Sequence, residues 1–405
     1  MPQWFKNYSG IIWLVAGILI GSAIGLIFGK QAEVLKPIGD IFLNLLFVAV
    51  IPLVFFCIAS SIASIDRGQK VGRVLGTMAA VFLGTVLVAA LVTMVALWLF
   101  PVTAPVAQSA APDLGGKGIN GDQVSQLFTT SEFFQLLSRK NMLAMIIFAL
   151  LTGFGVLRAD DKGEAFGKFL SSGAEVFEQV FILIMKIGPI GLGAYFAYQV
   201  AEFGPSLFGT YAHVMGVGYG VSIFYYAVFF SIYAFIAGGV KGIKTYWKNN
   251  IIPSVTAVGT CSSIATIPAN IEGAKRMGVS DMVTGITIPL GATLHKDGSS
   301  VSSILKMGVV FAMFGRGFSG PDVILLALGM TVLVSIVEGG IPNGGYVGEL
   351  LFISVYNFPP ETLPPAIIIG TLIDPVATLL NATGDTVAAM LVDRFVGGKK
   401  AVKAS

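Results

Sequence analysis

The sequence predicts an all-helical, polytopic membrane protein with eight transmembrane helices and two re-entrant helical hairpins. Hydrophobic residues make up 55% of the 405 residues, and charged residues only 12%, against roughly 25% in a soluble domain. The mean hydropathy is +0.83. Uncharged stretches of about 20 apolar residues, the length that a helix needs to cross the bilayer, recur through the first part of the chain.

Six apolar stretches before residue 250 are long enough, or nearly so, to be spans. They are residues 10–29, 41–65, 74–100, 142–157, 180–201 and 209–239. We interpret 10–29 as a retained first span and not as a signal peptide, because it is long and lacks a small-x-small cleavage motif. The segment 102–140, rich in Ser, Gly, Ala and Pro, is expected to pack over the outer surface without forming a domain.

Lysines and arginines gather in alternate loops, at 67–73, 158–168 and 241–248, and again in the C-terminal tail. Cytoplasmic loops of membrane proteins carry an excess of these residues. We therefore expect these loops and both termini on the cytoplasmic side of the inner membrane.

The apolar pattern changes after residue 250. Segment 251–268 is polar in its middle, and 322–358 is interrupted by glycines and a proline. Unsatisfied amides in hydrocarbon cost several kcal/mol each, so both segments must face protein or water. We expect two hairpins, with tips at Ser262–Ser263 and Gly339–Gly345, each followed by a long helix, 281–313 and 362–397. Such paired interruptions point to a transporter site, and buried loops without a ligand are the alternative.

Ionisable residues concentrate in the last third of the chain, although each costs roughly 2.5–3.5 kcal/mol inside a membrane. They are His295, Lys296, Asp297, Glu338, Asp374 and Asp385. Asp374, Thr378, Asn381 and Asp385 are spaced four, three and four residues apart, so they share one face of a helix. This polar stripe on an apolar helix indicates a wet or ligand-filled site, and a hydrogen-bonded seam between helices is the alternative. Gly298 is expected to serve close helix packing.

Other classes of function find little support in the sequence. The two cysteines and two histidines do not have the spacing of a disulfide scaffold or a zinc site, and no basic patch indicates nucleic-acid binding. A Walker motif is absent, and Asp374 and Asp385 lie about three turns apart on one helix, too far to share a proton as a protease dyad does. We therefore expect neither an enzyme nor a cofactor. An anion-conducting channel is the alternative from another class.

Several motifs together resemble the dicarboxylate/amino acid:cation symporters, a family that includes glutamate and neutral amino acid transporters. They are SSIATIP at 262–268, IPLGAT at 288–293 with the following DG, the glycine-rich second hairpin, and NATGD at 381–385. VIPLVFFCIASSIASI at 50–65 and GPIGLGAYFAYQVAE at 188–202 resemble the family's second and fifth spans. The likeness therefore covers nearly the whole chain and suggests a bacterial member.

The resemblance implies a homotrimer that works as an elevator, in which a mobile transport domain carries a small-molecule substrate past a fixed scaffold in the lipid bilayer. Residues 1–250 would form mainly the scaffold and trimerisation spans 1–6, with spans 3 and 6 moving with the transport domain. Residues 251–397 would form the transport core, and 398–405 a cytoplasmic tail.

The resemblance also assigns site residues. Ser262 and Ser263 match the hairpin tip that binds the substrate carboxylate, Asp374 the residue that binds its ammonium, and Asn381 the residue that holds its α-carboxylate. The other candidates for substrate binding are Thr266, Ser299, Gly345 and Thr378. Asp297 and Asp385 match carboxylates of the sodium sites, and the other candidates for the cation site are Thr293, His295, Lys296, Ser335 and Glu338.

The substrate site departs from the family pattern. Members that carry acidic substrates place an arginine in the site, but this chain has Cys261 and Ala377 at the two possible positions. Gly370 replaces the acid that usually supports that arginine. A buried carboxylate without a partner is costly. We therefore expect a small neutral amino acid or a similar polar zwitterion as the substrate, and a sodium-coupled symporter of dicarboxylates or acidic amino acids is the alternative.

The cation site departs as well, because His295-Lys296 stands where members usually read Asn-Met. Lys296 could stand in for Na⁺ beside Asp297, Asp385 and Glu338. Alternatively His295 and Glu338 could take up a proton, since imidazole titrates near neutral pH. Thr85 is the one candidate oxygen for a third sodium in segment 82–86. We expect weakened sodium coupling, with proton coupling or facilitated exchange in its place, and Na⁺ coupling is the alternative.

Overall fold

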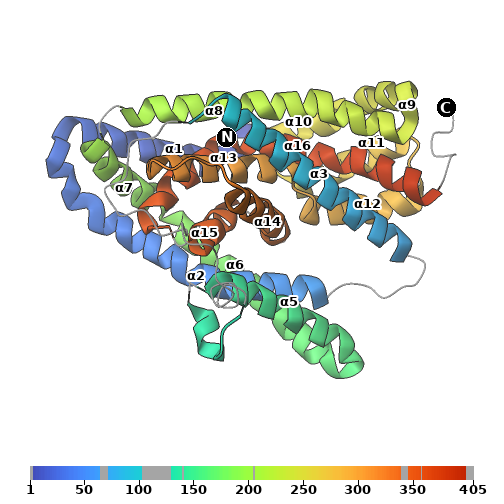
Figure 1. Cartoon of the computed structure of the whole chain (residues 1–405), viewed down its shortest axis with the longest axis horizontal. Coiled ribbons are helices and arrows are strands. Elements are labelled where there is room, and N and C mark those ends of the chain that lie inside the picture. The colour runs from blue at the N-terminus through green and yellow to red at the C-terminus, as the bar shows by residue number, and fades with distance from the viewer. Residues whose placement is uncertain are drawn as a thin grey trace.

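The computed structural model describes residues 3–63, 72–102, 129–138, 141–203, 206–338, 345–356 and 358–397. Every regular element in these ranges is helical, which confirms the predicted class (Figure 1). Four helical stretches in the described residues are long and apolar enough to cross a membrane, or five if one bent pair is counted as a span. The N-terminal stretch, Ile12–Ser60, contains two successive helices. The number of eight spans stays a prediction.

Five helices form a first group on one side of the molecule (Figure 1). They are α1 (Gln3–Phe28), α2 (Lys36–Ala63), α5 (Met142–Arg158), α6 (Glu164–Lys186) and α7 (Gly188–Phe203). Helix α1 lies along α7, and α2 packs against α5, α6 and α7. The predicted helices at 10–29 and 142–157 are confirmed, and the one at 41–65 is confirmed up to residue 63, since 64 and 65 lie outside the described residues. Of the segment 102–140, residues 103–128 and 139–140 lie outside the described residues, and Phe133–Leu137 form a short 3₁₀ helix, η2.

The span predicted at 180–201 is not one continuous helix. Helix α6 ends at Lys186 and α7 begins at Gly188, and the two are bent by 53° relative to one another. Pro189 explains the break, because proline lacks the N–H that would continue α6 but is tolerated in the first turn of a new helix. A pattern of apolar residues alone does not reveal this bend.

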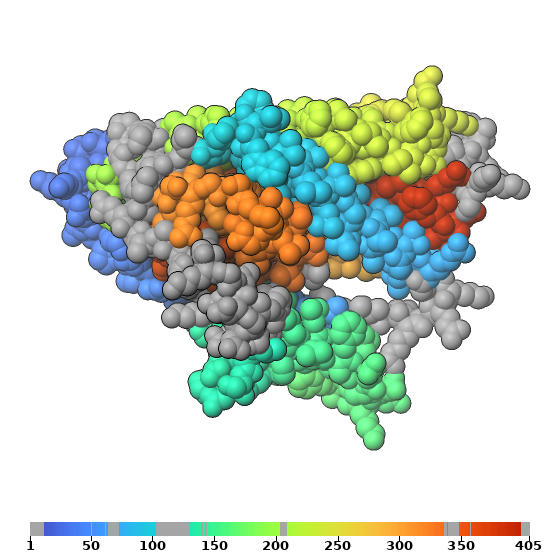
Figure 2. Space-filling view, in the orientation of Figure 1, coloured from blue at the N-terminus to red at the C-terminus, as the bar shows by residue number. Residues whose placement is uncertain are grey.

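The second group surrounds the C-terminal half of the chain. Helix α3 (Gly72–Leu99) packs against α13 (Asp297–Met313) and α16 (Leu363–Gly397), and Figure 2 shows it crossing one face of the molecule. Helix α8 (Ser206–Phe224), the π-helix η5 (Tyr225–Phe229) and α9 (Phe230–Asn249) form one run that passes the predicted end at 239. Gly239 has φ +63°, a conformation that glycine adopts without strain, so the chain kinks there and continues as a helix.

The first predicted hairpin has its tip at the expected residues. Helix α10 (Ile251–Thr260) ends at Cys261, which has φ +47°, and α11 (Ser263–Arg276) begins after Ser262. The Ser262 hydroxyl caps α11 by accepting a hydrogen bond from the Ala265 amide at 3.2 Å. Helices α10 and α11 pack on one another and on α16.

The second predicted hairpin consists of α14 (Pro321–Glu338) and α15 (Gly345–Val355), which also pack on one another. Its predicted tip, 339–344, lies outside the described residues, and Gly345 is described only as the first residue of α15. A short 3₁₀ turn at Pro360–Thr362 precedes α16. Helix α16 confirms the predicted long last helix, and it continues through Pro375.

The single helix predicted at 281–313 is wrong in one respect. Helix α12 (Asp281–Leu294) runs through Pro289 and Gly291, and the break comes later, at His295 and Lys296, before α13 begins. Both residues have extended φ values, −107° and −137°. Every residue from 295 to 311 is buried, so this break lies inside the protein. It brings the polar side chains of His295 and Lys296 to the centre of the second group.

Candidate functional site

The polar stripe of α16 meets the break between α12 and α13. Near the end of the stripe, Asp385 approaches α12 so closely that a Cβ at Gly291 would overlap its carboxylate. Two turns earlier on α16, Gly298 packs on the backbone at Ala377, where a Cβ would also overlap. The close packing expected of Gly298 is thus confirmed, and two glycines let α16 touch both sides of the break.

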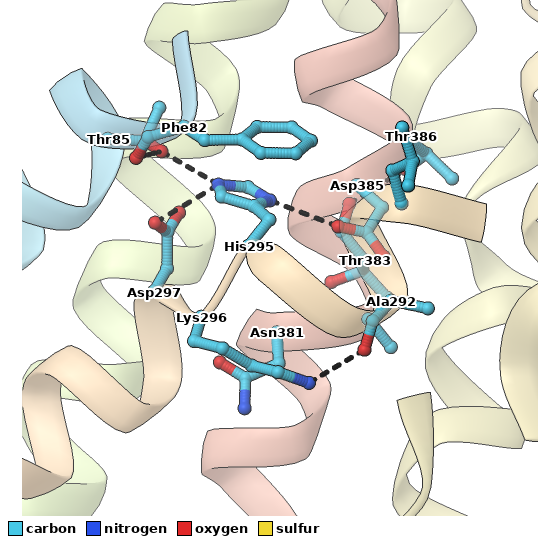
Figure 3. A network of polar contacts seen from close by, with 12 residues as sticks. Phe82, Thr85, Ala292, His295, Lys296, Asp297, Asn381, Thr383, Asp385 and Thr386 are labelled. Atoms are coloured by element: carbon cyan, nitrogen blue, oxygen red, sulfur yellow. Dashed lines mark hydrogen bonds and ion pairs between the residues drawn. The ribbon is translucent and has the colours of Figure 1, made fainter. Parts of the chain in front are cut away.

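The imidazole of His295 lies between the two carboxylates expected in sodium sites (Figure 3). Its Nδ1 is 3.0 Å from Asp385 Oδ1, and its Nε2 is 3.2 Å from Asp297 Oδ1, with all three side chains fully buried. Nε2 also forms a 2.7 Å hydrogen bond with the Thr85 hydroxyl. Phe82 stacks on the ring at 4.4 Å between centroids. A ring protonated on both nitrogens would place one positive charge between two carboxylates.

The π-helix η5 also contributes a side chain to this network. The Tyr225 hydroxyl lies 2.9 Å from the Thr85 carbonyl oxygen, 3.3 Å from Asp297 Oδ2 and 3.0 Å from the Tyr233 hydroxyl. Oδ2 of Asp385 has no hydrogen-bond partner among the described atoms, and Oδ1 of Asp297 has only the contact with His295 Nε2, which Thr85 shares, so the carboxylates keep unused acceptor capacity. Sequence reasoning missed Phe82, Tyr225 and Tyr233, because aromatic residues of an apolar helix carry no motif.

Lys296 does not form the direct bridge. Its ammonium donates a 2.8 Å hydrogen bond to the carbonyl of Ala292, in the last turn of α12, where helix carbonyls lack backbone partners (Figure 3). Electrostatic interactions still connect it with Asp385, Glu338 and Asp374. The side chain that contacts both Asp297 and Asp385 is therefore the imidazole of His295, and Lys296 acts at longer range.

Asn381 connects α16 to the first turn of α13. Its Oδ1 accepts hydrogen bonds from the amides of Gly298 and Ser299, at 2.8 and 3.1 Å, and its Nδ2 donates to the Ser299 hydroxyl at 3.2 Å. The Nδ2 group of Asn381 carries a second N–H besides the one that donates to Ser299. Asn381 and Ser299 thus lie together as expected, and their contacts hold the site in shape.

Asp374 has a different environment from the other carboxylates of the site. It is partly exposed, and its Oδ1 accepts a 3.3 Å hydrogen bond from Thr378, one turn further along α16. Electrostatic interactions connect it with Glu338, Lys306 and Lys296. A partly exposed carboxylate with one hydroxyl donor can accept further hydrogen bonds from a ligand's ammonium.

The remaining candidates are Ser263, Glu338 and three residues whose hydroxyl groups form hydrogen bonds within their own helices. The hydroxyls of Thr266, Thr293 and Ser335 donate to the carbonyls of Ser262, Leu290 and Thr331. Ser263 is buried at the start of α11. Glu338 is buried at the end of α14, where its carboxylate lies against Gly348 of α15. These residues lie on the two hairpins and α12.

Sequence reasoning also missed an ion pair beside the start of the stripe. Lys306 Nζ on α13 is 3.1 Å from Glu349 Oε1 on α15, and the two side chains are only 2% and 1% exposed. The Glu349 carboxylate stands where a Cβ of Gly370 would be. The signals in the sequence were the lone charges of Lys306 in segment 301–313 and Glu349 in segment 345–355.

The chain is similar to known membrane transport proteins over nearly its whole length. The model of the sodium:dicarboxylate symporter family matches residues 11–395. The chain is 26% identical to a C4-dicarboxylate transport protein of Rhodopseudomonas palustris over 95% of its own length and 88% of the relative's. It is 26% identical to a proton/sodium-glutamate symport protein of Bacillus caldotenax, over 96% and 95%. A C4-dicarboxylate transport protein of Bacillus subtilis is 25% identical, over 96% and 93%.

Proposed function

The chain belongs to the sodium:dicarboxylate symporter family, and we propose that it carries a small neutral amino acid or a similar small polar zwitterion, with weakened sodium coupling. Membership makes it a multi-pass membrane transporter of small molecules and not an enzyme. The observation that carries the proposal is the imidazole of His295 between Asp297 and Asp385.

The proposed coupling follows from this contact. A sodium ion between the two carboxylates would have to displace a ring that is bonded to Asp385 and Thr85 and stacked on Phe82. The imidazole of His295 therefore replaces part of the cation's role between the two carboxylates. This favours proton coupling or facilitated exchange over sodium coupling. The unused carboxylate oxygens leave room for a residual effect of sodium.

The proposed substrate follows from the other half of the stripe. Asp374 and Thr378 offer acceptors for an ammonium group, and neither Cys261 nor Ala377 can clamp a side-chain carboxylate as arginine would. The alternative, an acidic substrate, is favoured by the relatives' names and by two lysines, Lys306 and Lys296, that interact electrostatically with Asp374 at longer range. Both lysines are already engaged, Lys306 by Glu349 and Lys296 by the Ala292 carbonyl.

The packing supports an elevator with the proposed division of the chain. Helices α1, α2, α5, α6 and α7 pack mainly among themselves, and would form the scaffold within residues 1–250. Helices α3 and α8 pack on α13 and α16, and α9 packs on α16, as expected if spans 3 and 6 move with the transport core, 251–397. We propose a homotrimer in the cytoplasmic membrane with both termini, including the tail 398–405, on the cytoplasmic side.

A thermal-shift screen of the purified protein tests the substrate, because a ligand stabilises the folded state by mass action. Neutral amino acids, acidic amino acids and C4-dicarboxylates would each be added in sodium chloride and in choline chloride. We expect stabilisation by neutral amino acids in both salts. Stabilisation by dicarboxylates or acidic amino acids alone, and only in sodium, would overturn the proposal.

A further inference from the structure

The buried ion pair of Lys306 and Glu349 is unusual because removing both charges from water is expensive. The pair joins α13 to α15, and Gly370 of α16 leaves the space that the Glu349 carboxylate occupies. Replacing such a pair by apolar side chains is often neutral or stabilising. The presence of this ion pair in an apolar core therefore indicates a role other than stabilising the fold.

The pair keeps unused hydrogen-bonding capacity. Glu349 Oε2 is buried and has no hydrogen-bond partner among the described atoms. The ammonium of Lys306 donates to Glu349 Oε1 at 3.1 Å, and an ammonium carries further N–H groups. Leaving a buried acceptor without a partner destabilises the folded state. The pair thus offers one acceptor and at least one donor to a third group.

The pair lies one helical turn from Asp374. Gly370 and Asp374 are four residues apart on α16, which is about 6 Å along the axis and on the same face. An electrostatic interaction connects Lys306 with Asp374, and Gly370 is partly exposed. A ligand whose ammonium meets Asp374 can therefore extend a short side chain toward the pair.

We propose that Lys306 and Glu349 bind the side chain of the substrate and select an uncharged polar group, a hydroxyl or a carboxamide. This inference rests on the proposed function, because it places the ammonium of an amino acid at Asp374. Such a group accepts a hydrogen bond from Lys306 and donates one to Glu349 Oε2. A side-chain carboxylate meets the repulsion of Glu349, a cationic side chain that of Lys306, and an aliphatic side chain leaves both groups unsatisfied.

Binding of paired amino acids of similar shape to the purified full-length protein tests the inference. Threonine is compared with valine, and asparagine with leucine, by calorimetry. We expect the native protein to prefer the polar member about tenfold or more, and the double variant Lys306→Met/Glu349→Met to bind both members within about twofold. The double variant removes both charges, so neither is left unpaired in the core.

Two controls separate failure of the inference from failure of the proposed function. Asp374→Asn should abolish binding of threonine and valine alike, and binding of no amino acid by the native protein would overturn the proposed function itself. If valine binds the native protein as tightly as threonine, or the double variant keeps the preference, the inference alone is wrong. Tightest binding of aspartate by the native protein, lost in the double variant, would show instead that Lys306 holds a carboxylate.

Discussion

Replacement of His295 by asparagine, the residue that family members usually carry there, should make the protein depend on sodium for stability. The Coulomb attraction between a carboxylate and an imidazolium about 4 Å apart is about 4 kcal/mol at an effective dielectric of 20. Desolvation offsets much of this gain, and removing one partner of a buried pair costs about 3–5 kcal/mol. We expect His295→Asn to lose about this much stability in choline chloride, because Asp297 and Asp385 then face one another without a cation.

Sodium should restore much of the loss. An ion at 100 times its dissociation constant stabilises the folded state by about 2.7 kcal/mol. Thermal unfolding of the native protein and the variant in detergent, in sodium chloride and in choline chloride, measures the difference. His213→Asn is the matched control, since that histidine is exposed on α8 and should respond to neither salt. Strong sodium stabilisation of the native protein, or none of the variant, would refute the reasoning.

Three further substitutions probe other contacts of the site. Lys296→Met should not create sodium-dependent stability, because the ammonium lies on the Ala292 carbonyl, and the same salt comparison by thermal unfolding would reveal the opposite result. Gly298→Ala should cost about 1–3 kcal/mol, because its Cβ would overlap the backbone at Ala377, and an unchanged denaturation midpoint would count against this packing. Tyr225→Phe should lose about 1 kcal/mol through its hydrogen bonds while keeping the α-helical circular dichroism, and wild-type stability would show that the hydroxyl is dispensable.

Local features of the fold could be predicted from the sequence. The tip of the first hairpin follows from polar residues in an apolar segment, and the stripe of α16 follows from helical periodicity. Two boundaries could not be predicted from hydropathy. Pro189 separates α6 from α7 within an apolar run, and the break at His295 depends on buried partners that lie on α3 and α16.

Contacts between distant segments were the least predictable part of the site. Thr85 and His295 are 210 positions apart, and His295 and Asp385 are 90 apart, so no local pattern brings them together. The sequence identified His295 and Lys296 as departures from the family pattern and offered Lys296 as the stand-in for Na⁺, with proton uptake by His295 and Glu338 as the alternative. Neighbouring side chains on an extended segment point in opposite directions, and only the packing of α3 and α16 decides which one meets the carboxylates.

Uptake into proteoliposomes under imposed gradients tests most directly whether the imidazole of His295 replaces part of the cation's role. A neutral amino acid that stabilises the purified protein would be supplied with an inward sodium gradient, an inward proton gradient, or no gradient. We predict uptake that a sodium gradient changes little, either driven by the proton gradient or limited to exchange. Strong, saturable stimulation by sodium in the native protein would contradict the account.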